Sequence, residues 1–269
     1  MTPTPKCFSR LLIAACFAAT MTGSATAQLT KPFEPYSGQP GKDVVWVPTQ
    51  QALVDRMLDM AKVTPKDFLV DLGSGDGRTV ITAAKRGVRA MGVEFNPDMV
   101  ALSKRNAIEA GVADKATFVQ GDIFQTDFSK ADVVTLFLLS SLNLKLRPTL
   151  LDMKPGTRVV SNTFDMADWE PDESISASQE CSSFCRAMLW IIPAKVGGTW
   201  QMGKNDLTLT QNFQMLTGNV NAAPISNAKM RGTEITFTAG GKLYTGRVNG
   251  NRMEGVASDG SKWQATRRV

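Results

Sequence analysis

Hydrophobic positions follow two alternating periods over residues 46–195. Continuous apolar runs typical of buried strands lie at residues 67–72, 89–94, 116–120, 131–138, 157–162 and 187–192. Apolar positions with helical spacing lie at residues 53–61, 78–86, 97–110 and 142–153. Because strands that alternate with helices form mostly parallel sheets covered on both faces, the pattern predicts an α/β domain over residues 46–195.

The pattern changes after the Pro-Ala-Lys-Val-Gly-Gly stretch at residues 193–198. Short strand-like segments follow, with no helical run between them, at residues 206–211, 213–220, 234–238, 242–248, 252–256 and 262–265. Hairpin signals separate several of them, at Gly240-Gly241, Asn249-Gly250 and Asp259-Gly260. We therefore predict a second, small all-β antiparallel domain over residues 196–269, built as a meander, a sandwich or a barrel.

Residues 1–27 have the pattern of a secretory signal peptide. Lys6 and Arg10 charge its front, and the apolar run that follows is too short to span a bilayer. Ala25-Thr26-Ala27 forms a small-residue cleavage site. The pattern predicts export to the periplasm or secretion. Lipidation at Cys16 and retention as a membrane anchor remain alternatives.

Residues 28–45 are rich in proline, glycine and lysine and show no hydrophobic period, which is typical of a linker or arm.

The chain contains 4 cysteines and no histidine. Without histidine, Ser-His-Asp and Cys-His catalytic sites and His-bearing zinc sites are excluded. Cleavage of the signal leaves Cys181 and Cys185, which either pair in an oxidising compartment or remain core thiols. Two thiols do not complete a zinc site, so no metal is expected. The formal net charge of +5 has no blocks of like charge and says little about partners.

A glycine-rich turn, Gly73-Ser74-Gly75-Asp76-Gly77, joins the first buried strand to a helix. Glycines let the backbone N–H groups face a ligand, and a carboxylate at the end of the next strand, here Glu94, accepts hydrogen bonds from ribose hydroxyls. The dinucleotide-binding fingerprint fails, because its third glycine falls on Arg78. Asp71 instead opens the motif, and Gly121-Asp122 follows the third strand.

This order of motifs resembles the S-adenosylmethionine-dependent methyltransferases of the seven-stranded Rossmann-like fold. The resemblance implies that S-adenosylmethionine is the cofactor and that Asp71 and the glycine loop hold its methionine portion. It also implies that Glu94 takes the ribose and Asp122 the adenine amino group. The expected cofactor-binding residues are Thr49, Asp71, Gly73, Ser74, Gly75, Glu94, Asn96, Asp122 and Ile123.

Three segments, Val47-Pro48-Thr49, residues 71–78 and residues 92–97, resemble more narrowly the small protein-lysine methyltransferases that act on the ATP synthase c subunit and the adenine nucleotide translocator. The resemblance covers about residues 46–165 and leaves the β domain unexplained. In that family the Pro-Thr segment lies beside the cofactor, which implies a contact from Thr49. The alternative is that Thr49 caps the following helix.

Methyl transfer from a sulfonium is an in-line displacement that depends on placement and on exclusion of water, so no catalytic residue is assigned. A lysine acceptor must be neutral, and an apolar channel lowers its pKa. Residues 136–139 either line such a channel or simply end a buried strand. A (Asp/Asn)-Pro-Pro-aromatic motif is absent there, and the core up to Asn162 lacks cysteine. The first absence argues against methylation of nucleobase amino groups, and the second excludes attack by a thiolate on a pyrimidine ring, so a nucleic-acid partner is not expected.

Two further groups of residues have alternative interpretations. An acidic stretch with one aromatic residue follows the fifth strand and consists of Asp165, Asp168, Trp169, Asp172 and Glu173. It can receive a cationic substrate or form a solvated loop. The aromatic residues of the β domain form a binding face or its small core, and they are Trp200, Phe213, Phe237, Tyr244 and Trp263.

Together these features predict an exported methyltransferase that acts on lysine in a protein, with the β domain recruiting the substrate or a membrane-associated partner. A small-molecule methyltransferase is the second hypothesis. The third is a non-catalytic envelope binding protein, which the complete set of Asp71, Glu94 and Asp122 disfavours. The sequence leaves the oligomeric state open.

Overall fold

Seven strands form the first sheet, in the order β3-β2-β1-β4-β5-β7-β6. The first five strands along the chain are parallel, and the last two are antiparallel to their neighbours. Their bounds are β1 Phe68–Leu72, β2 Arg89–Glu94, β3 Ala116–Gln120, β4 Val133–Leu136, β5 Arg158–Asn162, β6 Glu173–Ser176 and β7 Arg186–Ile191. The predicted Rossmann-like α/β sheet is confirmed. Strand β6 was not predicted, because its residues are almost all exposed and show no apolar run.

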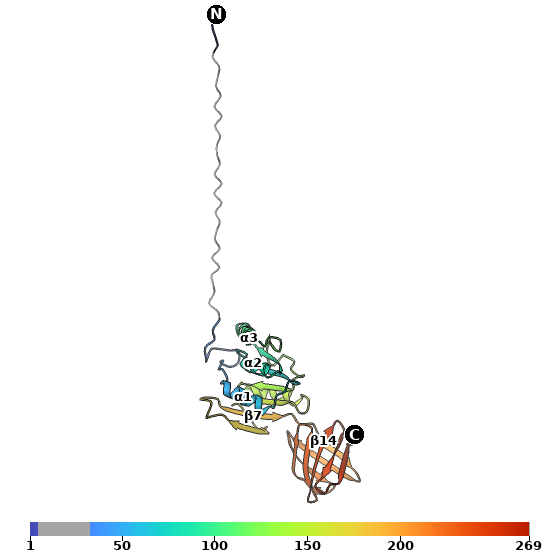
Figure 1. The fold of residues 1–269 in the computed structure, drawn as a ribbon. Coiled ribbons are helices and arrows are strands. Elements are labelled where there is room, and N and C mark those ends of the chain that lie inside the picture. The colour runs from blue at the N-terminus through green and yellow to red at the C-terminus, as the bar shows by residue number, and fades with distance from the viewer. Residues whose placement is uncertain (5–32, 269) are drawn as a thin grey trace. The chain divides into compact units, whose positions relative to one another are not determined.

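This computed structural model describes residues 1–4 and 33–268 (Figure 1). From residue 33 onward the chain forms one compact unit. Most of the expected signal peptide, with Cys7 and Cys16, lies outside the described residues. In the described ranges, no helix combines the length and the apolar character that a membrane crossing requires.

Helices cover both faces of this sheet, as the alternating pattern predicted. They are α1 Gln51–Met60, α2 Arg78–Lys85, α3 Pro97–Glu109 and α4 Ser140–Leu151. Helices α1, α2 and α3 pack with Leu69 and the other side chains on one face. Helix α4 packs with Val70 and its neighbours on the other face. Successive strand residues therefore point into two separate cores, which explains why the strands are apolar throughout.

The second sheet is wholly antiparallel and closes on itself through the pairing of β9 with β10 (Figure 1). Its strands are β8 Gly198–Met202, β9 Asn205–Asn212, β10 Met215–Val220, β11 Ala223–Pro224, β12 Ser226–Arg231, β13 Glu234–Ala239, β14 Lys242–Asn249, β15 Arg252–Ala257 and β16 Lys262–Arg267. The predicted all-β antiparallel domain is confirmed, and of the three forms considered it is a barrel. All three hairpin signals lie between consecutive paired strands.

The aromatic residues of the barrel form its core. Trp200, Phe237 and Trp263 are buried there, and the ring of Tyr244 stacks on Phe237 with 4.9 Å between centroids. Phe213 is different, because it lies against the core of the first sheet. Four of the five aromatic residues therefore serve the small core rather than a binding face.

The acidic stretch after β5 divides into two parts: Asp165 and Asp168 are exposed, whereas Trp169 is buried and Asp172 and Glu173 pair with the barrel. Trp169 is 1% exposed. The Asp172 side chain is also 1% exposed and pairs with Lys229 of the barrel at 3.1 Å. Glu173 pairs with Arg231 of the barrel at 2.5 Å. Most of this stretch therefore joins the barrel to the first sheet.

Candidate active site

All nine residues expected to contact the cofactor line one pocket at the carboxyl edge of the first sheet. They come from four places that are distant in the sequence: the segment before α1, the end of β1 with its glycine loop, the end of β2, and the turn after β3. The structure thus brings the whole set together, while the contact of each residue with the cofactor remains a prediction.

The glycine loop adopts a backbone that side chains disfavour. Gly73, Gly75 and Gly77 have φ angles of +81°, +54° and +83°. A Cβ atom on Gly75 would overlap the indole ring of Trp46. The carbonyl of Gly75 accepts a hydrogen bond from the Ser103 hydroxyl at 2.8 Å, which fixes the loop to α3. The N–H groups of Gly73 and Ser74 bond to Val93 O, so the left-handed turn is held tightly at the pocket wall, which it lines with Gly73, Ser74 and Gly75.

Asp71 ends a buried strand and is 7% exposed. The Thr135 hydroxyl donates a hydrogen bond to its Oδ1 at 2.6 Å. Burial raises the pKa of the Asp71 carboxyl group to about 7; the Thr135 hydrogen bond opposes the rise, and the charge of Glu94 adds to it. A cation placed beside Asp71 would stabilise the ionised form, so the site suits the ammonium group of the methionine portion.

Glu94 connects the end of β2 to the glycine loop. Its Oε2 accepts a hydrogen bond from Gly75 N and its Oε1 accepts one from Asn96 N, both at 2.9 Å. Each carboxylate oxygen keeps a free lone pair, which suits the two donating hydroxyls of a ribose. Asn96 also caps α3, because its Oδ1 accepts a hydrogen bond from Asp98 N at 2.9 Å.

Asp122 lies in the turn after β3, beside Ile123. Its Oδ1 accepts a hydrogen bond from Phe124 N at 2.9 Å, and its Oδ2 accepts one from Lys42 Nζ at 2.7 Å. Both interactions hold the pKa of Asp122 below its ordinary value. The ammonium of Lys42 also lies 5.1 Å from the centre of the Phe95 ring.

Residues 39–49, here called the strap, form a wall of the same pocket. The segment expected as a linker or arm therefore contributes to the site. Within the strap, Trp46 N donates a hydrogen bond to Gln39 O at 2.9 Å, and Arg78 Nη1 donates one to Thr49 O at 2.8 Å. Sequence reasoning missed Lys42, Trp46 and Arg78 as members of the site. Arg78 stands inside the matched glycine motif, which was the available signal.

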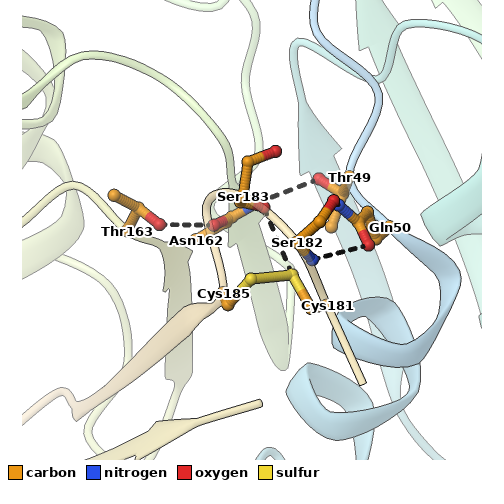
Figure 2. Close-up of a disulfide and its surroundings, with 8 residues drawn as sticks. All are labelled: Thr49, Gln50, Asn162, Thr163, Cys181, Ser182, Ser183 and Cys185. Carbon is orange, nitrogen blue, oxygen red and sulfur yellow. Dashed lines mark hydrogen bonds between the residues drawn. A yellow bond between two sulfur atoms is a disulfide. The ribbon is translucent and has the colours of Figure 1, made fainter. Parts of the chain in front are cut away.

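Thr49 lies in the pocket wall and does not cap a helix. Gln50 precedes α1, and no side chain caps that helix. Thr49 is 8% exposed. Its hydroxyl accepts a hydrogen bond from Asn162 Nδ2 at 3.3 Å (Figure 2). The alternative of Thr49 as a helix cap is therefore wrong.

The end of β4 supplies the apolar wall. Leu136, Phe137 and Leu138 line the pocket, whereas Leu139 is 42% exposed. The pocket thus combines carboxylates along β1, β2 and β3 with an apolar side at β4. S-Adenosylmethionine fits this donor set, and when bound it supplies a methyl group on a sulfonium centre. The residues of the chain then have to hold the reactants in line and exclude water.

Comparison with known proteins agrees with this geometry. The model of the ANTKMT methyltransferase domain matches residues 71–173. A protein-lysine N-methyltransferase of Saccharolobus islandicus is 46% identical over 135 residues, which cover 49% of this chain and 84% of that protein. The Mus musculus lysine N-methyltransferase of the ATP synthase c subunit is 35% identical over 130 residues, which cover 48% of this chain and 52% of that protein. The chain therefore spans only about half of the mouse protein.

A solved structure shows the same likeness. The crystal structure of an RNA methyltransferase from Salinibacter ruber, in complex with S-adenosyl-L-homocysteine, has 49% sequence identity and a TM-score of 0.53. The aligned region covers 56% of this chain and 96% of the Salinibacter chain. Motifs, pocket and relatives agree, and the chain belongs to the S-adenosylmethionine-dependent methyltransferase family that includes the Saccharolobus protein-lysine N-methyltransferase.

Proposed function

We propose that this protein transfers a methyl group from S-adenosylmethionine to the side-chain nitrogen of a lysine in a protein. The observation that carries the proposal is the 46% identity to a protein-lysine N-methyltransferase, 84% of which the chain covers. The apolar wall at Leu136, Phe137 and Leu138 supports it. An apolar channel disfavours the ammonium form of the lysine and so provides the neutral amine that attacks.

We further propose that the enzyme works outside the cytoplasm, as a periplasmic or secreted protein. The signal-like residues 1–27 support this location. The disulfide between Cys181 and Cys185 supports it too, because structural disulfides persist in oxidising compartments. In this proposal, the C-terminal barrel presents the substrate or a membrane-associated partner, and S-adenosylmethionine reaches the enzyme from the cytoplasm.

Calorimetric titration with S-adenosylmethionine and S-adenosylhomocysteine tests the cofactor site. We expect micromolar binding, about −8 kcal/mol. Glu94→Ala should weaken it, because the carboxylate also holds Gly75 N. Absence of binding by well-folded protein would contradict the proposed function.

Incubation with methyl-labelled S-adenosylmethionine and a cell-envelope extract tests the acceptor. We expect the label to enter a protein band and mass spectrometry to locate it on lysine. Label that resists protease and is released by ribonuclease would favour RNA, the substrate class named for the Salinibacter relative. Label confined to low-mass material would favour a small-molecule enzyme. Separation of cell fractions tests the proposed location.

A further inference from the structure

Three phenylalanine rings meet at the edge of the first sheet that bears the cofactor pocket. The ring centroids of Phe137 and Phe184 are 5.3 Å apart, and each lies 6.1 Å from that of Phe164. Phe137 itself lines the pocket. This phenylalanine trio is therefore continuous with the cofactor site, although Phe164 and Phe184 lie outside the pocket lining.

The order of the strands places the trio on the acceptor side. Predicted cofactor contacts run from Asp122 after β3, for the adenine, to Asp71 on β1, for the methionine portion. The next strands in the sheet are β4, β5 and β7. Phe137 follows β4, Phe164 follows β5 and Phe184 precedes the antiparallel β7. The three rings thus lie beyond the methionine end of the pocket.

The trio is accessible, unlike the other ring clusters of this sheet. Phe184 is 40% exposed, and Phe137 and Phe164 are half-buried. In contrast, Trp169 and Trp190 are 1% and 0% exposed. Packing of the core therefore does not explain the trio, whose ring faces remain available to an apolar chain or a cation.

The backbone around the trio is held in a costly conformation. Phe184 has a φ angle of +54°, and Thr163, directly before Phe164, has one of +61°. A left-handed residue other than glycine persists only where its surroundings fix it. These two residues set the places from which the rings of Phe164 and Phe184 emerge.

Phe184 belongs to the Cys181–Cys185 loop, which is held by residues at the start of α1. The disulfide closes the loop, and the Gln50 side chain holds it, because Gln50 Nε2 donates to Ser182 Oγ at 2.7 Å and Ser182 N donates to Gln50 Oε1 at 3.2 Å (Figure 2). Arg56 of α1 adds an ion pair with Glu180 at 2.9 Å. Since Gln50 follows Thr49 of the pocket wall, the loop and the pocket share one support.

We propose that the phenylalanine trio is the acceptor site: its rings enclose the aliphatic part of the incoming lysine, and the disulfide loop positions Phe184 for that contact. This assignment rests on the proposed function. Asp165 provides charge complementarity beside Phe164, since in the described ranges no cationic side chain pairs with it. The lysine ammonium first gives a proton to water. Its nitrogen then forms the N–C bond to the methyl group while the C–S bond breaks, and the electron pair stays on sulfur.

The substitution Phe184→Ala tests the trio, with poly-L-lysine as the acceptor probe. Loss of one ring contact should raise the KM for poly-L-lysine about tenfold and change kcat less than about twofold. The Kd for S-adenosylhomocysteine should stay the same, because Phe184 lies outside the pocket lining. Calorimetry with pentalysine and the S-adenosylhomocysteine complex gives a second readout without turnover, in which Phe184→Ala should weaken binding by the same factor.

Matched variants separate this role from a general loss of structure. Leu243→Ala removes a comparably exposed apolar side chain from the barrel and should leave every constant unchanged. Phe184→Tyr keeps the ring and should restore the KM. The double variant Cys181→Ser/Cys185→Ser should reproduce the KM rise of Phe184→Ala while still binding S-adenosylhomocysteine.

The results show separately whether the acceptor-site assignment fails or the proposed function fails. If wild-type protein methylates poly-L-lysine and Phe184→Ala leaves both its KM and pentalysine binding within about twofold, the trio is not the acceptor site, although lysine methylation stands. If wild-type protein binds S-adenosylmethionine but methylates neither poly-L-lysine nor any envelope protein on lysine, the proposed function fails, and the assignment of the trio to lysine fails with it.

Discussion

At the scale of single residues, Asp71 links cofactor binding to pH. Its pKa is raised to about 7, so near neutral pH part of the free protein holds it protonated. An ammonium group binds better to the ionised form. We predict that affinity for S-adenosylmethionine increases from about pH 5 to about pH 8, and that binding at pH 6 releases a proton. Calorimetry in buffers of different ionisation enthalpy measures this release. Proton-neutral binding at pH 6 would contradict the prediction.

The Asp71 carboxyl group also affects the stability of the cofactor-free protein. Its contribution decreases with rising pH, whereas the affinity for S-adenosylmethionine increases. The pKa of Asp71 is about 7 in the folded state and about 3.9 in the unfolded state, so the neutral form is favoured by folding. The contribution of Asp71 to the free energy of unfolding is therefore fully present below about pH 4 and is lost, by up to roughly 1.4 kcal/mol per pH unit, as the pH rises to about 7. We predict that Asp71→Asn, which mimics the neutral form, raises the free energy of unfolding of the cofactor-free protein at pH 8. Urea denaturation at pH 5 and pH 8 measures the difference, and no gain at pH 8 would count against it.

The sequence predicted the residues that a local motif contains and missed those that reach the pocket by tertiary contact. Asp71, Gly75 and Glu94 were found because a short strand, turn and strand position them relative to one another. Lys42 was missed because nothing in a linker-like composition shows that it pairs with Asp122. Trp46 was missed because no local motif shows that it packs against the glycine loop. Of the two interpretations of Thr49, the helix cap is wrong because Gln50 precedes α1 and the Thr49 hydroxyl pairs with Asn162, while its contact with the cofactor remains a prediction.

At the scale of elements, the strap forms one wall of the pocket and lies over the glycine loop. Trp46 lies directly against Gly75, and its backbone bonds with Gln39 fold the strap upon itself. We predict that Trp46→Ala weakens binding of S-adenosylhomocysteine about tenfold, chiefly through faster dissociation, because the loop loses its cover. Stopped-flow displacement measures the rate.

Tyr36→Ala is the matched control for the strap, since Tyr36 is an aromatic residue shortly before it but is 65% exposed and lies outside the pocket lining. Its dissociation rate should equal that of the wild type. Equal rates for Trp46→Ala and wild type would show that the strap does not retain the ligand.

Two of the strands that the sequence missed, β6 and β12, have few buried residues. Strand β6 is almost wholly exposed, and it forms because its backbone pairs with β7. Strand β12 buries only Ala228 and Met230. In both cases a neighbouring strand supplies the hydrogen bonds, and pairing of this kind leaves no local hydrophobic period in the sequence.

At the scale of the whole molecule, side chains of the barrel pack against and bond to the α/β domain. The ring of Phe213 stacks on Trp169 with 5.6 Å between centroids, and the guanidinium of Arg147 lies 5.2 Å from its centre. Gln214, which is 4% exposed, donates a hydrogen bond to Glu170 O at 2.7 Å. These contacts explain why the chain from residue 33 onward behaves as one compact unit.

We predict that Phe213→Ala uncouples the two sheets. Removal of a partly buried ring at the interface should lower the free energy of unfolding by about 2–4 kcal/mol and split one thermal transition into two. Differential scanning calorimetry measures both effects. Met215→Ala, which shortens a 52% exposed side chain on β10, should leave a single transition at the wild-type temperature. Because Phe213 lies outside the cofactor pocket, its variant should still bind S-adenosylhomocysteine at low temperature. A single unshifted transition would mean that the barrel and the α/β sheet are stabilised independently of this contact.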